Sequence, residues 1–163
     1  MDVFKFVTGE KISFMFSNTA KYAMRAVIYM AMHQGDNDPA KIGIKKMAED
    51  LDMPVYFLGK IMQTLAKNKI LNSYKGPNGG FTFNVDPDEL SLLDIVKIFD
   101  GTDVFDNCLL GLNLCKDNPE MRQICPLADN LDTCVAKLYD YLDSKKVGQI
   151  AKSLKDIKEF VMI

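Results

Sequence analysis

The stretch Lys75-Gly76-Pro77-Asn78-Gly79-Gly80-Phe81 decides the fold of this 163-residue chain. It lies between an apolar helical segment, residues 57–71, and the alternating run Phe81-Thr82-Phe83-Asn84-Val85. Glycine, proline and asparagine in succession between two short strand-like pieces are typical of a tight hairpin turn. The glycines let another backbone approach closely, and Lys75 suits a phosphate or a guanine edge. A basic hairpin that directly follows a helix–turn–helix is a wing, so this stretch predicts a DNA-binding winged helix.

The segment before the hairpin carries two helical patterns joined by a tight turn. Residues 44–51 place apolar side chains on one face, and Pro54 suits the first position of the next helix, where its missing N–H costs nothing. This second helix runs to about Asn68; we expect it to bury Phe57 or Leu58 and to carry polar and basic residues on its other face. An earlier helix is capped near residues 17–19 and ends at residue 35. Together these segments predict a helix–turn–helix.

Two further helices are predicted after the hairpin. Ser91 and Asp94 resemble a capping box, which predicts a helix from Leu92 to about Asp100. Apolar residues then recur at helical spacing between residues 127 and 142, and residues 147–163 indicate one more short amphipathic helix. The long stripe has no obvious partner within the chain, so we expect it to pair with its twin in a two-fold dimer that matches a palindromic operator. The predicted dimer interface consists of Leu127, Leu131, Cys134, Val135, Leu138 and Leu142.

These patterns predict a mainly α (α+β) fold, a winged helix–turn–helix with a long C-terminal dimerisation helix. Residues 1–16 are an N-terminal extension, either a short hairpin or an unstructured leader. Residues 17–101 form the DNA-binding domain, residues 102–125 a cysteine-bearing sensor loop, and residues 126–163 the dimerisation helix and a C-terminal helix. No apolar run has membrane-spanning length and the N-terminus lacks the pattern of a signal peptide, so we expect a cytoplasmic protein.

The net charge of −2 conceals an uneven distribution of charge along the chain. Residues 17–85 hold nine Lys and Arg against five Asp and Glu, whereas residues 86–146 hold six against thirteen. The basic part coincides with the predicted winged helix, and the local field matters more for DNA binding than the total charge. Ordinary solvated surface would explain the basic part by itself, but next to a wing it supports a nucleic-acid partner.

Several motifs, in this order, resemble the Rrf2 family of bacterial transcriptional regulators, which includes IscR, NsrR and CymR. They are Tyr22-Ala23-Met24-Arg25, residues 44–49, Pro54-Val55-Tyr56-Phe57-Leu58, the wing, Leu92-Leu93-Asp94-Ile95 and a cysteine-bearing segment after residue 101. The resemblance covers about residues 15–150, and the wing is its most specific part. It implies a homodimeric repressor that binds palindromic double-stranded DNA, with the third helix in the major groove and the wing in the minor groove.

The resemblance also implies which residues contact DNA. Lys75 stands where family members often have arginine. Gly59 stands where the iron–sulfur regulator has an acidic base-reading residue, so its target sequence is not carried over. Lysines that bind phosphates add salt dependence but little specificity. The predicted DNA-binding residues are Pro54, Val55, Tyr56, Gly59, Lys60, Gln63, Thr64, Lys67, Lys75, Gly76, Pro77, Asn78 and Gly79.

Four cysteines, Cys108, Cys115, Cys125 and Cys134, carry the remaining distinctive chemistry. Their spacing fits neither a zinc ribbon nor a thioredoxin pair, and structural disulfides are rare in a reducing compartment. Sensing members of the family bind an iron–sulfur cluster through three cysteines of this segment. The resemblance therefore implies Cys108, Cys115 and Cys125 as cluster ligands.

At the positions where family members have a fourth cluster ligand, this chain has residues that cannot bind iron. Its histidine position is Ala128, and its acidic position on the first helix is Lys21. Cys134 could complete the set, although on the apolar stripe it is equally expected to be a buried packing residue. His33, the single histidine, is expected to cap the first helix at the surface. We expect a cluster, with a reversible disulfide sensor and simple packing cysteines as the alternatives.

The chain is not expected to be an enzyme. It has a single histidine and lacks a Ser/His/Asp arrangement, a phosphate loop and a dinucleotide motif, which leaves little with which to build a catalytic site. Two other functions stay open: a winged helix that binds protein, and a small redox protein whose cluster transfers electrons without binding DNA. A steep fall of DNA affinity with salt distinguishes a DNA-binding protein from both.

Overall fold

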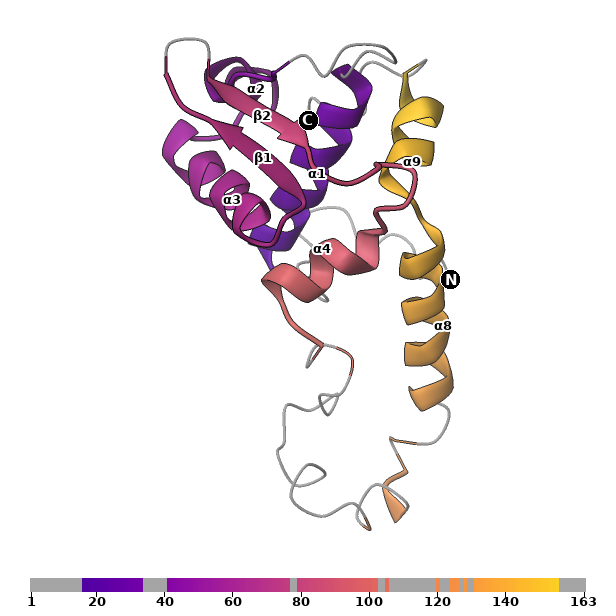
Figure 1. The fold of residues 1–163 in the computed structure, drawn as a ribbon. Helices are drawn as coiled ribbons and strands as arrows, with labels where there is room; N and C mark the ends of the chain where they lie inside the picture. Colours follow the sequence, from indigo (N-terminus) through magenta and orange to yellow (C-terminus); the bar gives the residue numbers. More distant parts are fainter. Residues whose placement is uncertain are drawn as a thin grey trace, which may run out of the picture.

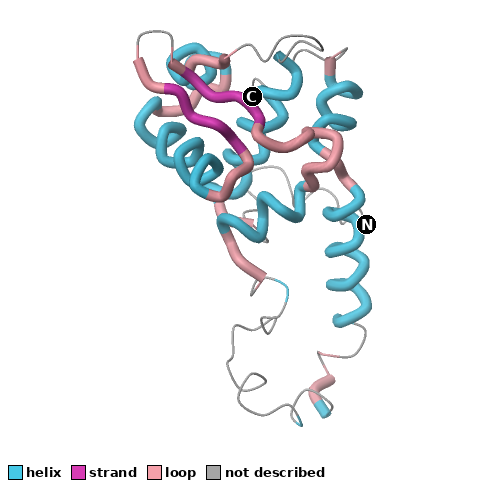
Figure 2. Tube along the Cα trace, viewed as in Figure 1, coloured by secondary structure: helices cyan, strands magenta, loops and turns pink. Residues whose placement is uncertain are grey.

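The computed structural model describes residues 16–33, 41–76, 79–102, 105, 120, 124–126, 128 and 131–155. Six helices and one two-stranded sheet make up this part (Figure 2). The predicted mainly helical fold is therefore confirmed. The hairpin expected within residues 1–16 lies outside the described residues, and so do Pro77, Asn78, Cys108, Cys115 and Leu127.

Three helices form the predicted helix–turn–helix unit (Figure 1). α1 spans Asn18–His33, α2 spans Ile44–Asp50 and α3 spans Val55–Lys67. The start of α1 is capped as the sequence predicts, because the Ser17 hydroxyl oxygen accepts a hydrogen bond from the backbone N–H of Ala20 at 3.0 Å.

The entry into α3 differs by one residue from the prediction. Pro54 is the N-cap residue of α3, with φ −59° and ψ 126°, rather than its first helical residue. The fixed φ of proline fits this position, and the Pro54 carbonyl accepts a hydrogen bond from the N–H of Leu58 at 3.0 Å. Leu58 is fully buried, whereas Phe57 is half-buried and meets Tyr22 edge-on, with 5.5 Å between the ring centroids.

The main core lies between the helix–turn–helix unit and the hairpin. α3 buries one of its faces in this core. The residues on that face are at most 1% exposed: Leu58, Ile61, Met62 and Leu65. This burial leaves the opposite face of α3 to solvent, as the helical period requires. Other members of the core are Ala23, Val27, Met30, Met47, Leu51, Leu71, Phe81 and Ile95.

The hairpin is an antiparallel pair anchored to the chain that precedes α2. β1 (Leu71–Tyr74) pairs with β2 (Gly80–Phe83). On the other side of β2, Ile42 forms a bridge to Phe81: the N–H of Ile42 donates to the Phe81 carbonyl at 3.0 Å, and the N–H of Phe81 donates to the Ile42 carbonyl at 3.1 Å. A Cβ on Gly80 would lie 2.6 Å from the Ile42 oxygen, so this close approach requires glycine.

The predicted capping box begins α4 (Leu92–Phe99). The Ser91 hydroxyl oxygen accepts a hydrogen bond from the N–H of Asp94 at 3.1 Å, and the Asp94 carboxylate accepts one from the N–H of Ser91 at 3.0 Å. Gly101, with a φ of 74°, follows the end of the helix in the left-handed region that glycine favours.

Loss of this cap is expected to destabilise the fold measurably. Ser91→Ala removes the hydroxyl from a fully buried site, so we expect the free energy of unfolding to fall by about 1 kcal/mol. Urea denaturation followed by circular dichroism measures this change. Ser153→Ala is the matched control, because the hydroxyl of Ser153 is exposed and serves only the carbonyl of Gln149 within its own helix. Equal effects of the two substitutions would rule out a stabilising capping box.

α8 (Leu131–Ser144) packs against α4, which corrects one expectation. The stripe on α8 does have a partner within the chain. Leu142 is only 5% exposed and lies in a second cluster with Leu93 and Val96 of α4 and with Phe105, while Val135 packs beside it. The sequence stripe alone could not reveal this contact, because it depends on how α4 is placed after the hairpin.

α9 (Val147–Leu154) lies alongside α1, on the side away from the hairpin (Figure 1). The loop before α4 receives the start of α9: the N–H of Val147 donates to the Leu90 carbonyl and that of Gly148 donates to the Pro87 carbonyl, both at 2.8 Å. These bonds tie the junction between α8 and α9 to the winged unit, by which we mean α1 to α4 together with the hairpin. Within the described part, no helix combines the length and apolarity needed to cross a lipid bilayer.

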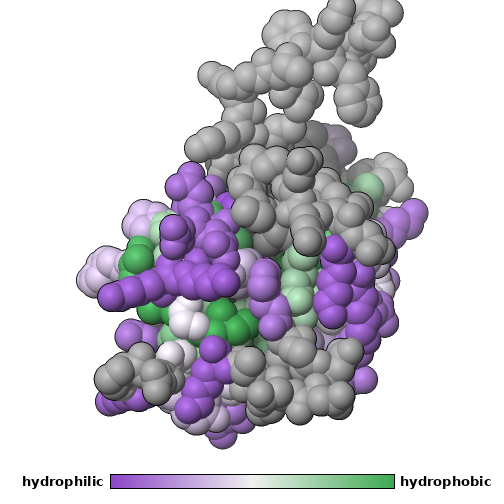
Figure 3. Space-filling model, turned by 90° about the horizontal axis from the view of Figure 1, so that it is seen from above, coloured by the Kyte–Doolittle hydropathy of each residue, from purple (hydrophilic) through white to green (hydrophobic). Residues whose placement is uncertain are grey.

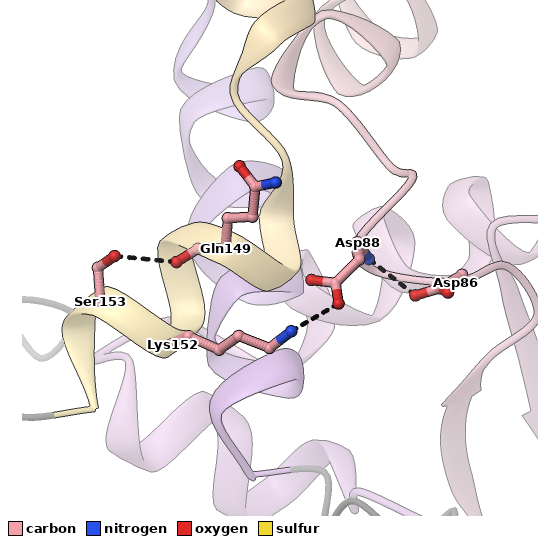
Figure 4. A network of polar contacts seen from close by, with 5 residues as sticks. All are labelled: Asp86, Asp88, Gln149, Lys152 and Ser153. Atoms are coloured by element: carbon pink, nitrogen blue, oxygen red, sulfur yellow. Dashed lines mark hydrogen bonds and ion pairs between the residues drawn. The ribbon is translucent and has the colours of Figure 1, made fainter.

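An ion pair reinforces the same junction (Figure 4). The Lys152 ammonium lies 2.6 Å from a carboxylate oxygen of Asp88, and the N–H of Asp88 donates to the carboxylate of Asp86 at 2.9 Å. The other carboxylate oxygen of Asp88 is buried and faces the backbone of Gly148. A side chain at position 148 would overlap this carboxylate, which explains the glycine.

Candidate nucleic-acid interface

The start of α3 exposes large apolar side chains. Tyr56 is 76% exposed and Val55 is 46% exposed, while Pro54 before them is also exposed. A solvent-facing helix start of this kind, opposite a face that is fully buried, can enter a groove without disturbing the core.

Further along the same face of α3, the polar side chains differ in their exposure and in the contacts that they already make. Lys60 is exposed and its ammonium lies 4.5 Å from the centroid of the Tyr56 ring. The Thr64 hydroxyl donates a hydrogen bond to the Lys60 carbonyl at 2.9 Å, so its proton is used within the helix. Gln63 and Lys67 are exposed. Gly59 is half-buried, with only the Ile44 side chain near its Cβ position.

The hairpin presents a cation on a turn that glycines shape. Lys75 and Gly76 are exposed, and Gly76 has a φ of 105°, which favours glycine. The N–H of Gly79 donates to the Gly76 carbonyl at 2.9 Å, and a Cβ on Gly79 would overlap the carbonyl of Tyr74.

Two residues at this surface were missing from the sequence-based set. Tyr74 is 43% exposed, and the Lys41 ammonium lies 4.6 Å from the centroid of its ring. Lys41 precedes the Ile42 bridge to β2, which brings it to the hairpin. The bridge joins segments far apart in sequence, so no local pattern pairs Lys41 with Tyr74. The exposed aromatic residue next to Lys75 was the one available signal.

The winged unit carries many exposed cations. Seen from the end of the molecule where α2 and the hairpin lie, hydrophilic residues cover much of the described surface, with apolar residues between them (Figure 3). In residues 41–76 seven exposed lysines stand against the exposed acids Glu49 and Asp52, and such an excess of positive charge attracts a polyanion. The exposed lysines of residues 41–76 are Lys41, Lys45, Lys46, Lys60, Lys67, Lys69 and Lys75.

One of the acids of α2 is bound inside the unit. The Asp50 carboxylate accepts a hydrogen bond from the Tyr29 hydroxyl of α1. Burial, followed by the nearby Asp50 carboxylate, raises the pKa of Tyr29, so the phenol keeps its proton and remains a donor at ordinary pH. This bond joins α1 to the end of α2 and draws one negative charge toward α1.

The structure describes two of the four cysteines, Cys125 and Cys134. Cys125 is half-buried. Cys134 is exposed, so the expectation that it is buried in the stripe is wrong for the single chain, because its side of α8 faces away from α4. Among the described residues, no three His, Cys, Asp or Glu side chains converge to hold a metal ion. His33 stacks on Tyr29, and its ring nitrogen Nδ1 lies 2.8 Å from the Tyr29 carbonyl oxygen at the end of α1.

The remaining residues of the predicted dimer stripe divide between two sides of α8. Val135 and Leu138 are half-buried and pack with Leu142 on the α4 side. Leu131, the first residue of the helix, is half-buried, and Cys134 is exposed. Tyr141, which was not in the predicted set, is 57% exposed and lies on the same side of α8 as Cys134. α4 therefore covers part of the stripe and leaves a second face of α8 exposed.

Comparison with known proteins agrees with this geometry. Residues 16–153 match the model of the Rrf2 family, described as an iron-dependent transcriptional regulator. The chain is 33% identical to an Aquifex aeolicus protein that carries the name HTH-type transcriptional regulator. The alignment spans 148 residues, which are 89% of this chain and 94% of that protein. It is 22% identical to the HTH-type transcriptional regulator NsrR of Bacillus subtilis, over 89% of this chain and 95% of NsrR.

Solved structures share the fold. The global cysteine regulator CymR of B. subtilis superimposes with a TM-score of 0.64 at 18% identity, covering 85% of this chain and 96% of CymR. IscR of T. potens gives a TM-score of 0.63 at 18% identity, covering 91% of this chain and 93% of IscR. The relatives are transcriptional regulators and not enzymes, which confirms that expectation.

Proposed function

The chain belongs to the Rrf2 family of DNA-binding transcriptional regulators, and on that premise we propose that it is a homodimeric repressor that binds palindromic promoter DNA through α3 and the wing. The observation that carries the proposal is the exposed start of α3, where Tyr56 and Lys60 face solvent, close in sequence to a hairpin with Lys75 exposed. Base edges would meet α3, and phosphates would meet the lysines. A repressor of bacterial promoters acts in the cytoplasm, where we place it. We also keep residues 17–101 as the proposed DNA-binding domain.

The proposed dimer uses the face of α8 that α4 leaves exposed. Cys134 and Tyr141 lie on it, and pairing of two such helices would bury side chains that now meet water. Light scattering at micromolar concentration should give twice the chain mass of 18.4 kDa. A species of 18.4 kDa that binds its operator would rule out the dimer.

The wing lysine should contribute to DNA affinity through charge. Lys75→Ala removes an exposed cation from the hairpin, so binding should weaken for all sequences and the salt slope of log K should fall by about one. Fluorescence anisotropy with an operator duplex at several salt concentrations measures both quantities. Lys137→Ala removes an exposed cation from α8, outside the winged helix; it is the matched control and should leave both quantities unchanged. An unchanged salt slope for Lys75→Ala would remove the wing from the interface.

For the signal, we propose an iron–sulfur cluster held by Cys108, Cys115 and Cys125. Three thiolates are the donors that such clusters take, and the family model is described as iron-dependent. The fit is partial: Ala128, at the family's histidine position, supplies no donor atom, so the fourth ligand comes from elsewhere. When bound, a cluster would supply a centre that oxidants or iron loss can change.

Purification without oxygen tests the cluster directly. We expect a coloured protein with visible absorbance and bound iron, and Cys115→Ala should lose both. A colourless, iron-free protein from such a preparation would exclude the cluster. If the DNA affinity of such a protein changed with a thiol oxidant and recovered with a reductant, the signal would be sensed by a reversible disulfide.

A further inference from the structure

We propose that α3 selects operators whose half-sites are rich in T·A pairs, because Val55 and Tyr56 contact thymine methyl groups and Gln63 pairs with adenine. This inference rests on the proposed function and specifies its target. It concerns the base pairs under α3, and the wing and the cysteine-bearing segment are not needed for it.

The first support is the set of side chains that α3 lacks. None of its 13 residues, VYFLGKIMQTLAK, is Asp, Glu, Arg, Asn or His. Cytosine is read through acceptors such as Glu and Asp, and guanine through Arg or Lys. The lysines of α3 are Lys60, which lies over the Tyr56 ring, and Lys67, which is the last residue of the helix and lies far from its exposed start. Gln63 is exposed and is the side chain of α3 that can bond adenine with a donor and an acceptor together.

The second support is the apolar start of the helix. In the major groove, the thymine methyl is the apolar group on a base edge, and apolar side chains recognise it by contact. Tyr56 is 76% exposed and Val55 46% exposed, at the end of the recognition helix that enters the groove in helix–turn–helix proteins. Gly59, three residues after Tyr56, adds no side chain that would shield the ring.

Two of the three other polar residues on this face, Lys60 and Thr64, are already engaged. Thr64 donates its hydroxyl proton to the Lys60 carbonyl, which leaves it no donor for a base. The Lys60 ammonium lies 4.5 Å from the centroid of the Tyr56 ring, over its face. Held there, Lys60 suits a phosphate beside the groove while the ring edge of Tyr56 meets the bases.

Selection from a random DNA library with the full chain, purified without oxygen, provides the operator. We expect enriched half-sites rich in T·A pairs. Each contacted thymine is then replaced by uracil, which removes only the methyl group. Affinity should fall about fourfold for each contacted methyl that is removed, which corresponds to the free energy of burying one CH₂ group. Contacted adenines are replaced by 7-deazaadenine, which removes the N7 acceptor.

Variants assign each effect to its residue. Val55→Ala combined with Tyr56→Ala should bind thymine and uracil operators equally, yet keep its sensitivity to 7-deazaadenine. Gln63→Ala should show the reverse pattern. All three side chains are exposed, so circular dichroism should show an unchanged fold.

The outcomes separate this inference from the proposed function. Enrichment of G·C-rich half-sites, or equal affinity of the unaltered protein for thymine and uracil operators, would overturn the T·A selection and leave DNA binding intact. Failure to enrich any duplex would overturn DNA binding itself, and this inference with it.

Discussion

Replacing Gly80 by alanine is expected to lower the free energy of unfolding by about 3 kcal/mol and to abolish tight DNA binding. The added Cβ would lie 2.6 Å from the carbonyl oxygen of Ile42 and 3.0 Å from its carbonyl carbon. Because both are backbone atoms, no side-chain rotation relieves the overlap. The chain must separate at the Ile42–Phe81 bridge, and two backbone hydrogen bonds are lost with it.

Gly43→Ala is the matched control for this substitution. A Cβ at Gly43 has nothing within 4 Å, and the residue precedes α2 by one position. We expect a loss below about 1 kcal/mol, which reflects the weaker N-cap preference of alanine. Urea denaturation measures stability, and anisotropy measures DNA affinity. If Gly80→Ala and Gly43→Ala behave alike, the bridge does not anchor the hairpin.

Valine at Gly148 is expected to cost about 3 kcal/mol of folding stability, because it would force α9 away from the loop before α4. Its Cβ would overlap the Asp88 carboxylate and lie 3.0 Å from the Asp88 backbone nitrogen. Moving α9 breaks the hydrogen bond from Gly148 to the Pro87 carbonyl and the ion pair between Asp88 and Lys152. The ion pair is largely exposed, so overlap and lost packing against α1 dominate the cost.

A double-mutant cycle isolates the contact with Asp88. Asp88→Ala removes the carboxylate, so part of the penalty of Gly148→Val should disappear in the double variant. Gln149→Val, at the next and exposed position of α9, serves as the control and should change stability little. Additive effects of the substitutions at positions 88 and 148 would show that the overlap does not limit α9.

Elements defined by neighbouring residues were predictable from the sequence. The capping box needs only Ser91 and Asp94, and the glycine-rich turn of the hairpin specifies its own backbone. The helical spacing of the apolar residues in α3 likewise predicted its buried face. In each case, residues at most a few positions apart determine the structure.

Contacts between distant segments were not predictable in this way. The apolar stripe of α8 was expected to have no obvious partner within the chain, yet Leu142 packs against α4, which is distant in sequence. The Lys41 contact with Tyr74 and the Tyr29 bond to Asp50 depend on how the helices and the hairpin assemble. The contact between Lys41 and Tyr74 adds these two residues to the proposed DNA-binding surface.

Photo-crosslinking from three positions tests most directly whether α3 and the wing bind one duplex. A benzophenone amino acid is placed at Gln63 on α3, at Lys75 on the hairpin or at Lys137 on α8, all of which are exposed, and each variant is irradiated with the selected operator. We predict crosslinks to the operator from positions 63 and 75 and none from position 137. Crosslinks from position 137, with none from positions 63 and 75, would contradict the proposed interface.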